Sequence, residues 1–502
     1  MWPWSFFFLR GVSGLHNADP HESPSNSKTA AVAVHDVAQG TDSPLIKYLP
    51  GFLKDGISGR HNLQAVIGNS GWLFSDKIIR MGGALVIGLW VARYLGPRQF
   101  GLLNFALAFT SLFSAVAVLG LDGIVVRELV KFPEKRDVIL GSAFILRFVA
   151  SFITLGLVIV SISILRHGDT LVIWVVAVTG AAVIFQSLNV IDLFFQSKVQ
   201  SRYSVYASNS AFLLASLAKV GLLLAAAPLI AFAWVGLGEF VLASLFLLLA
   251  YRARHMSILA WRYSLSVMRD LLRDSWPLIF SGISIVISLR VDQVLIGQMM
   301  NDKQLGIYSA ATKIAEVWYF VPIGIATSVY PRLAEIKKHS KHLYDEKLGK
   351  CYDFLTSSSI AFALIITILS GPIVRLLYGA AYVSAVQPLR ILIWSVVPIS
   401  IGASWTNWML LENRTRTMFH FQLFGAALNL SLNLLLIPRL GIVGSAYATL
   451  ISYGAWIVVL CPLMKSQREP FVMIIKAVFL VRLFNRIFRP INPNGKNQTT
   501  ES

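Results

Sequence analysis

The stretch Leu95-Gly96-Pro97-Arg98-Gln99-Phe100-Gly101-Leu102 occurs a second time, in altered form, as Met300-Asn301-Asp302-Lys303-Gln304-Leu305-Gly306-Ile307. At the same offset of 205 residues, Arg127 corresponds to Arg332, and each arginine follows the second long apolar stretch of its half. Matches that recur in order at one fixed offset are the sequence signature of a duplicated structural unit. The chain is therefore predicted to contain two related halves.

A third match near the end of each half pairs Trp234-Val235-Gly236-Leu237 with Ile442-Val443-Gly444-Ser445 at an offset of 208 residues. Each half contains six apolar stretches of the length that a membrane helix needs, about 20 residues. These twelve predicted spans are 71–92, 101–119, 139–165, 170–191, 211–229, 231–250, 276–298, 306–330, 355–377, 387–410, 420–437 and 442–464.

The composition of the 502 residues supports a membrane protein, because 56% are hydrophobic and only 14% are charged. Soluble domains carry about 25% charged residues, and long soluble chains divide into domains with polar surfaces. A soluble enzyme is therefore excluded. The two cysteines, Cys351 and Cys461, are too few for a disulfide framework or a zinc site.

Six spans are an even number, so both halves enter the membrane from the same side and form parallel repeats. We predict an all-α multi-pass membrane protein with about twelve transmembrane helices in two parallel six-helix bundles around a central cavity. The alternative is a six-plus-six arrangement without a cavity. The loops on one side carry 19 Lys and Arg, and those on the other carry at most seven. The positive-inside rule places the richer side and both termini in the cytoplasm.

Composition divides the chain into five segments. Residues 1–68 are expected to be a mostly disordered cytoplasmic tail. Met1–Arg10 makes a poor signal peptide, and the polar composition of 17–45 is typical of disorder. Residues 470–489 alternate apolar and basic side chains and predict an amphipathic helix on the inner leaflet, with a solvated tail as the alternative. The predicted segments are 1–68 (tail), 69–250 (N-terminal bundle), 251–275 (cytoplasmic linker), 276–465 (C-terminal bundle) and 466–502 (basic cytoplasmic tail).

Ionisable residues within the predicted spans are the candidates for function, because a charge at the bilayer centre costs at least roughly 2.5–3.5 kcal/mol. Arg290 lies deep in its span and has no evident partner on its own helix. A guanidinium binds phosphate oxygens in pairs and keeps its charge, so Arg290 is a candidate for contact with an anionic ligand. The candidate substrate-binding residues are Arg290, Arg147, Lys313, Arg80 and Lys77.

The carboxylates in the spans are candidates for coupling to an ion, with structural pairing as the competing interpretation. Asp76 and Arg80 are four residues apart, so they share a helix face and can pair. Lys219 and Glu239 fall at similar depth on adjacent spans, and Asp292 is expected to point towards Lys313. The ion-coupling candidates are Asp292, Glu316, Asp76 and Glu239.

Sequence motifs for enzymatic chemistry are missing. The sequence contains no GxxxxGK[ST] phosphate loop, no HExxH and no Cys/His cluster. Loops between the spans are about 25 residues at most, too short for a catalytic domain. We therefore expect no enzyme, no metal site, no cofactor and no nucleic-acid partner, with H⁺ or Na⁺ as the candidate coupling ion.

Four motifs resemble a known family. Ala92–Gly101 resembles the first loop of the Wzx-type oligosaccharide flippases of the multidrug/oligosaccharidyl-lipid/polysaccharide (MOP) exporter superfamily. Asp292–Met299 with Leu305–Ala311 resembles the family's span 7–8 signature. The remaining motifs are Leu377-Tyr378-Gly379 with Tyr382, and Asn433–Pro438 with Gly441–Gly444. The resemblance covers about 69–465, while residues 1–68 depart from the pattern.

The resemblance implies a flippase that moves a polyprenyl-diphosphate-linked oligosaccharide from the inner to the outer leaflet by alternating access. It implies polysaccharide biosynthesis (O-antigen, capsule or exopolysaccharide), a cell inner-membrane location, and polysaccharide polymerase machinery as a candidate partner. Alternatives are a multidrug or small-molecule exporter of the same superfamily, a membrane-embedded glycan polymerase or ligase, and a non-transporting membrane assembly protein.

Overall fold

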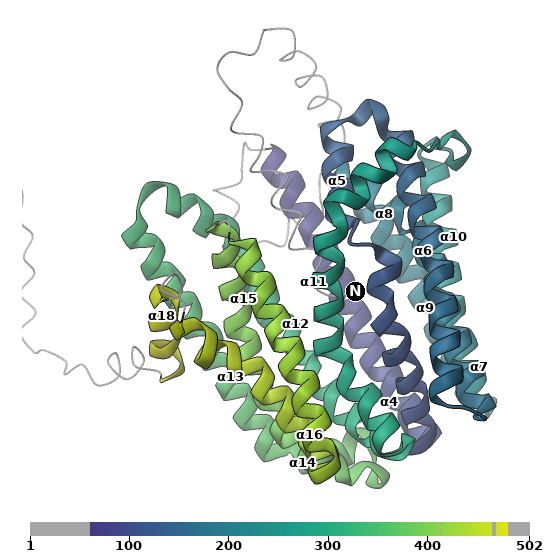
Figure 1. Ribbon diagram of the computed structural model, residues 1–502, viewed down its shortest axis with the longest axis vertical. Coiled ribbons are helices and arrows are strands. Elements are labelled where there is room, and N and C mark those ends of the chain that lie inside the picture. Colours follow the sequence, from purple (N-terminus) through teal and green to yellow (C-terminus); the bar gives the residue numbers. More distant parts are fainter. Residues whose placement is uncertain (1–60, 413, 464–467, 480–502) are drawn as a thin grey trace, which may run out of the picture.

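The computed structural model describes residues 61–412, 414–463 and 468–479, and every regular element in these ranges is helical (Figure 1). The helices gather into an N-terminal lobe and a C-terminal lobe. The N-terminal lobe contains α4 (His61–Val118), α5 (Asp122–Lys131), α6 (Arg136–Leu165), α7 (Thr170–Gln186), α8 (Val190–Ser197), α9 (Arg202–Leu224) and α10 (Leu229–Ala253). The predicted tail, 1–68, lies almost wholly outside the described residues.

The C-terminal lobe follows a short connection that contains one 3-10 turn, Ile258–Ala260. Its helices are α11 (Leu265–Met299), α12 (Asp302–His339), α13 (Lys341–Tyr378), α14 (Val386–Leu392), α15 (Val396–Leu411), α16 (Thr415–Ala455), α17 (Cys461–Leu463) and α18 (Arg468–Val478). Helix α11 begins inside the segment predicted as a linker, 251–275. The lobe boundaries proposed from composition otherwise stay predictions.

Local sequence explains where several helices begin and break. The side chain of Asn301 accepts a hydrogen bond from the backbone N–H of Gln304 at 2.9 Å, which caps the start of α12. Ser340 caps α13 in the same way, through the N–H of Leu343 at 3.2 Å. Gly96 (φ 68°) and Gly441 (φ 62°) interrupt α4 and α16, at angles that glycine adopts without strain. The break at Gly96 corresponds in the repeat to Asn301, so both halves change direction at the same point.

Nine helical stretches among the described residues are long and apolar enough to cross a bilayer. Two of these stretches contain the glycine breaks, and α12 is not among them. The structure thus shows an all-α, multi-pass membrane protein with two helical lobes, and the number twelve stays a prediction.

The two lobes converge at one end of the molecule and diverge at the other (Figure 1). At the closed end, which contains 95–101 and 300–306, one hydrophobic core joins both lobes and includes Phe105 of α4 and Tyr308 of α12. Towards the open end the cores are separate, one around Leu140 and Tyr251 and another around Tyr352. Burial of apolar area therefore holds the lobes together mainly at the closed end.

Further contacts join the lobes at the closed end. A Cβ atom on Gly101 would lie 1.7 Å from the carbonyl oxygen of Asp302, so backbone meets backbone where the two repeats cross. Arg93 donates to the carbonyl oxygen of Leu377 at 2.8 Å, and Tyr382 donates to that of Ala92 at 2.7 Å.

Helix α11 belongs to both lobes. Leu271 in its first half is buried in the N-terminal core, and Asp274 pairs with Arg127 of α5 at 2.5 Å. Its second half packs in the C-terminal lobe, where Ser281 donates to Gln422 of α16 at 2.7 Å. Pro277 lies between the two halves.

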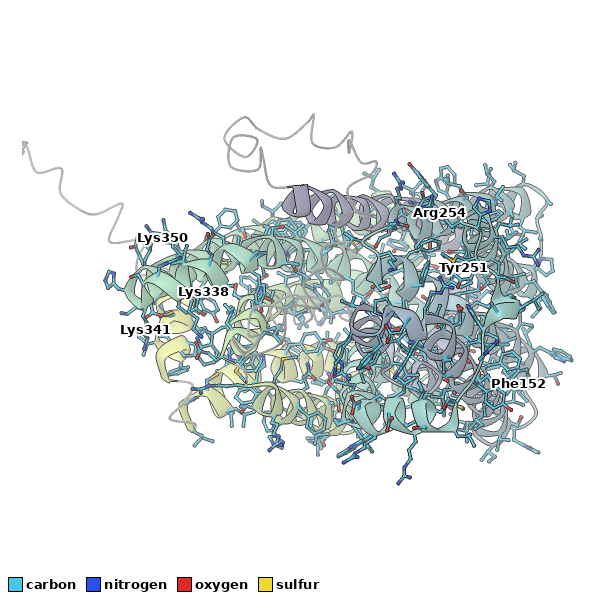
Figure 2. The ribbon with its side chains drawn as sticks, turned by 90° about the horizontal axis from the view of Figure 1, so that it is seen from above. Phe152, Tyr251, Arg254, Lys338, Lys341 and Lys350 are labelled. Atoms are coloured by element: carbon cyan, nitrogen blue, oxygen red, sulfur yellow. The ribbon has the colours of Figure 1, made fainter. Side chains whose placement is uncertain are left out.

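The open end carries the basic loops. Figure 2 views the molecule from this end and shows Arg254 on the N-terminal lobe and Lys338, Lys341 and Lys350 at the far edge of the C-terminal lobe. The predicted amphipathic segment 470–489 is described only up to 479. Its helix, α18, buries Ile474 and Ala477 in the C-terminal core, so these apolar side chains contact protein.

Candidate functional site

A cavity of about 420 Å³ lies between the lobes. Residues of α4, α5 and α6 line one side of it, and residues of α11 and α12 line the other. Three cations and two carboxylates are among the lining residues, so the formal charge of the lining is positive by one. The charged lining residues are Arg147, Arg290, Lys313, Asp122 and Glu316.

Arg290 lines this cavity and has a partner on the neighbouring helix, which the search along its own helix did not reveal. Its Nη1 donates to Glu316 Oε1 at 3.0 Å, across α11 and α12. The two side chains remain 33% and 27% exposed, so water and a ligand can reach the pair. Paired in this way, Arg290 can still offer its remaining N–H donors to an anion.

Arg147 also lines the cavity, although its side chain is only 3% exposed. Its Nη2 donates to Oδ1 of Asp122, the first residue of α5. A buried cation bound to a carboxylate stabilises the local packing as long as both partners are present. This pairing favours a structural role for Arg147 over direct contact with a ligand.

Lys313 is the cavity cation that has no carboxylate partner in the part of the chain that the structure describes. Its Nζ lies 5.8 Å from the centroid of the Phe100 ring. Glu316, one turn away on α12, is bound to Arg290. The ammonium is therefore available to an anionic group that enters the cavity.

The remaining cations predicted from the sequence lie elsewhere in the N-terminal lobe. Lys219 pairs with Glu239 at 3.1 Å, which confirms the predicted structural pair, and Arg80 lies 3.8 Å from the same carboxylate. These three residues do not line the cavity. The side chains of Asp76 and Lys77 lie outside the described residues, so their predicted contacts stay predictions.

The sequence suggested that Asp292 points towards Lys313, and the structure shows that it does not. It is 4% exposed, and its carboxylate accepts a hydrogen bond from the hydroxyl of Tyr308 at 2.6 Å and one from the N–H of Gln293 at 2.7 Å. Arg290, two residues before Asp292 on α11, points to another side of the helix and pairs with Glu316, so it makes no ion pair with Asp292 although the two charges are close enough to interact. Asp292 has no basic partner among the described side chains.

A buried polar chain continues from Asp292 through Tyr308 into α16. The side chains of Ser445 and Thr449 of α16 lie near the Tyr308 hydroxyl. Ser445 donates to Asn433 Oδ1 at 2.7 Å, and Asn433 donates to Asn429. The Tyr308 hydroxyl that binds Asp292 therefore lies beside a set of hydroxyl and amide groups on α16.

Sequence reasoning missed the neutral polar lining of the cavity. Its signal was present as hydroxyl and amide side chains inside apolar spans, but it is weak because such residues also bond to their own helix. These neutral residues are Ser111, Ser114, Ser151, Gln186, Ser187, Asn189 and Tyr319. Across the described ranges no cluster of three His, Cys, Asp or Glu could hold a metal ion.

Two family models match the chain. The model described as "Polysaccharide biosynthesis protein" matches residues 66–337, more than half of the sequence, and the model MatE matches residues 277–435. A curated relative, "Probable flippase AglR" of Haloferax volcanii, is 28% identical over 174 residues. That match covers 32% of this chain and 35% of the relative, so the chain spans about a third of the length of that protein.

Solved structures share the fold. An inward-facing MATE-family multidrug transporter of the MOP superfamily is 15% identical, with a TM-score of 0.63 over 81% of this chain and 96% of that chain. The lipid II flippase MurJ in an inward closed conformation is 14% identical, with a TM-score of 0.62 over 84% and 93%. A MOP transporter from Pyrococcus furiosus, whose binding pocket is described as having reverse polarity, is 14% identical, with a TM-score of 0.53 over 84% and 96%.

Proposed function

The chain belongs to the polysaccharide biosynthesis protein family and has the fold of the MOP transporters, and from this premise we propose that it is a flippase for a polyprenyl-diphosphate-linked oligosaccharide. The observation that supports this substrate is Lys313, a cation in a cavity between the lobes that has no carboxylate partner among the described side chains. A diphosphate supplies the anionic oxygens that an ammonium and the free N–H groups of Arg290 bind.

The shape of the molecule supports an inward-facing state within an alternating-access cycle. The basic loops lie at the open end, and the positive-inside rule places that end in the cytoplasm. A lipid-linked substrate in the inner leaflet would then reach the cavity with its diphosphate and sugars, while the polyprenyl chain stays in lipid. Transport would require the two lobes to separate at the closed end and to come together at the open end.

Asp292 is the strongest of the ion-coupling candidates. Glu316 and Glu239 form ion pairs with cations at 3.0 and 3.1 Å, whereas the hydrogen bonds that Asp292 accepts come from the neutral Tyr308 hydroxyl and the Gln293 N–H. A buried carboxylate of this kind either takes up a proton or is neutralised by a bound Na⁺ that oxygen ligands coordinate. We propose that this neutralisation changes with the state of the lobes.

A flipping assay tests the function. Purified protein in liposomes receives a short polyprenyl-diphosphate oligosaccharide whose label is quenched only from outside. The expected result is quenching above protein-free liposomes, and its loss in Lys313→Gln. If liposomes with imposed H⁺ and Na⁺ gradients show no flipping with neutral or acidic glycans, the flippase proposal is overturned. A dye-export assay in the same liposomes checks the drug-exporter alternative, which the positive cavity disfavours for cationic drugs.

A further inference from the structure

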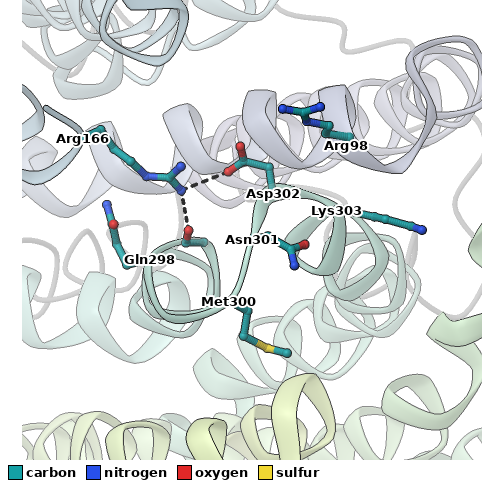
Figure 3. A pocket seen from close by; sticks show the side chains of 8 residues that line it. Arg98, Arg166, Gln298, Met300, Asn301, Asp302 and Lys303 are labelled. Carbon is teal, nitrogen blue, oxygen red and sulfur yellow. Dashed lines mark hydrogen bonds and ion pairs between the residues drawn. The ribbon is translucent and has the colours of Figure 1, made fainter. Parts of the chain in front are cut away.

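A second pocket, of about 470 Å³, lies at the closed end. Arg98 and Arg166 line it from the N-terminal lobe, and Gly297, Gln298 and the segment Met300–Lys303 line it from the C-terminal lobe (Figure 3). Arg98 and Lys303 occupy corresponding positions of the two repeats, 205 residues apart. The duplication therefore brings one cation from each lobe to the same pocket.

One carboxylate in the pocket is already bound. Arg166 donates through Nη2 to Asp302 Oδ1 at 3.0 Å and to the carbonyl oxygen of Gly297. The guanidinium also lies over the ring of Phe105, at 4.9 Å from its centroid. Figure 3 shows Arg166 beside Asp302, the first residue of α12. This ion pair crosses between the lobes and fixes the inner wall of the pocket.

Arg98 and Lys303 have no carboxylate partner in the described part of the chain, and both side chains are exposed. With Asp302 balanced by Arg166, the pocket has an excess of two positive charges. Such an excess in a concave site attracts an anion. Arg98 binds phosphate oxygens through a planar fork of donors, and Lys303 adds a point charge from the opposite lobe.

The pocket exists only while the closed end stays closed. Its cations come from different lobes, and the backbones between them touch at Gly101 and Gly306. Separation of the lobes would move Arg98 away from Lys303 and break the Arg166–Asp302 pair. A ligand that binds one state only shifts the equilibrium towards that state.

We propose that this pocket is an anion-binding site shared by the two lobes, that it takes a phosphate or diphosphate group, and that its occupancy stabilises the closed state of this end. The orientation argued from the basic loops makes this the extracytoplasmic end. The site lies apart from the central cavity and rests on the proposed function only for its physiological consequence, which is slower opening to the outside.

Binding of inorganic pyrophosphate to the purified full chain tests the proposal, with thermal stabilisation as the readout. Arg98→Gln/Lys303→Gln should weaken the apparent affinity about tenfold, as expected when about 1.4 kcal/mol of binding energy is lost. The matched control is Lys338→Gln/Lys347→Gln, which removes the same charge from exposed positions at the open end and should bind like the parent protein.

Two further variants separate this site from the central cavity and test its shared construction. Lys313→Gln should keep pyrophosphate binding; if it abolishes binding and the Arg98/Lys303 variant does not, the anion binds in the cavity and the proposal is overturned, while the proposed function stands. Gly306→Ala should weaken binding although both cations remain. Equal stabilisation of all variants would show non-specific binding and also overturn the proposal.

The phosphate could come from solution or from a lipid headgroup, and nanodiscs distinguish these sources. In neutral lipid, pyrophosphate should stabilise the protein. If replacing part of the lipid with an anionic phospholipid raises the melting temperature and removes the pyrophosphate effect, a headgroup occupies the pocket. If the pyrophosphate effect is unchanged in anionic lipid, the site serves soluble or glycan-linked phosphate.

Discussion

Arg290 of α11 donates to Glu316 of α12 at 3.0 Å, so two of the three charged residues that line the cavity from the C-terminal lobe form an ion pair with each other. Because of this pairing, Lys313 is the cavity cation that can bind an entering anion without first breaking an ion pair with a carboxylate of the described residues. The electrostatics of the cavity therefore depend on which of these three side chains is removed.

Arg290→Met should destabilise the protein more than the double variant Arg290→Met/Glu316→Met. The single change leaves Glu316 in the cavity without its donor, at a cost of about 1–3 kcal/mol, whereas the double change removes both polar partners. Melting in detergent measures the difference. Both variants should lose flipping if the guanidinium binds substrate, and normal flipping in the single variant would disprove that role.

Lys313→Gln should leave the melting temperature nearly unchanged, because no ion pair is broken, and should reduce flipping at least about tenfold, the equivalent of 1.4 kcal/mol. Lys219→Gln is the matched control, since it removes a lysine that is bound to Glu239 away from the cavity lining. We expect the control to melt lower and to keep its apparent affinity for substrate. The opposite pattern would place the substrate anion at Lys219.

Arg147→Met should lower stability by about 1–3 kcal/mol, because it leaves the partly buried Asp122 carboxylate, 28% exposed, without its donor. Asp122→Asn in the same chain should restore part of the loss. Detergent melting and size-exclusion profiles report both changes. A stable Arg147→Met protein with weakened substrate binding would show instead that this guanidinium contacts the ligand.

Gly306→Ala should open the closed end, because the added Cβ would lie 1.9 Å from the carbonyl oxygen of Pro97 and 3.0 Å from the backbone nitrogen of Gly101. Reaction of a cysteine placed at Gln298 with an impermeant maleimide should become faster. Gly156→Ala is the control, because a Cβ there meets no atom within 4 Å. An unchanged labelling rate in Gly306→Ala would mean that the backbones separate without moving the lobes.

Asp292→Asn should make flipping insensitive to imposed H⁺ or Na⁺ gradients, since an amide carries no charge to neutralise. The variant keeps an acceptor for the Tyr308 hydroxyl, so the fold should persist. Rates with each gradient in turn identify the ion. Glu239→Gln provides the comparison, and gradient dependence that survives in Asp292→Asn but is lost in Glu239→Gln would transfer the coupling role to the N-terminal lobe.

The repeat was the part of the fold that the sequence predicted best, because glycines and helix starts recur at a fixed offset. Residue type and depth also predicted that Arg147, Arg290 and Lys313 would lie in a membrane-embedded site. The residues with which these charged side chains form ion pairs or hydrogen bonds were predicted less well. Glu316 lies on another helix, and pairing across helices depends on their rotation about their axes, which spacing along the chain does not give.

Two partners had specific reasons to escape prediction. Asp122 follows a turn at Gly120, just past the end of a predicted span, and was therefore not counted among the buried charges. Tyr308 was treated as part of a family motif rather than as a donor, yet its hydroxyl binds Asp292. Short-range pairs were easier: Lys219 and Glu239 lie on consecutive helices that pack together, and their contact is present.

The division of α11 between the lobes bears on the order in which the protein is made. The N-terminal core contains Leu271, and Gly120 packs against Leu278, so the N-terminal lobe is incomplete when translation reaches the end of α10. It can finish packing only after the ribosome has released the first half of α11. The two lobes are therefore similar in plan but not independent during biosynthesis, and a chain divided at 254–264 would separate the first lobe from part of its own interior.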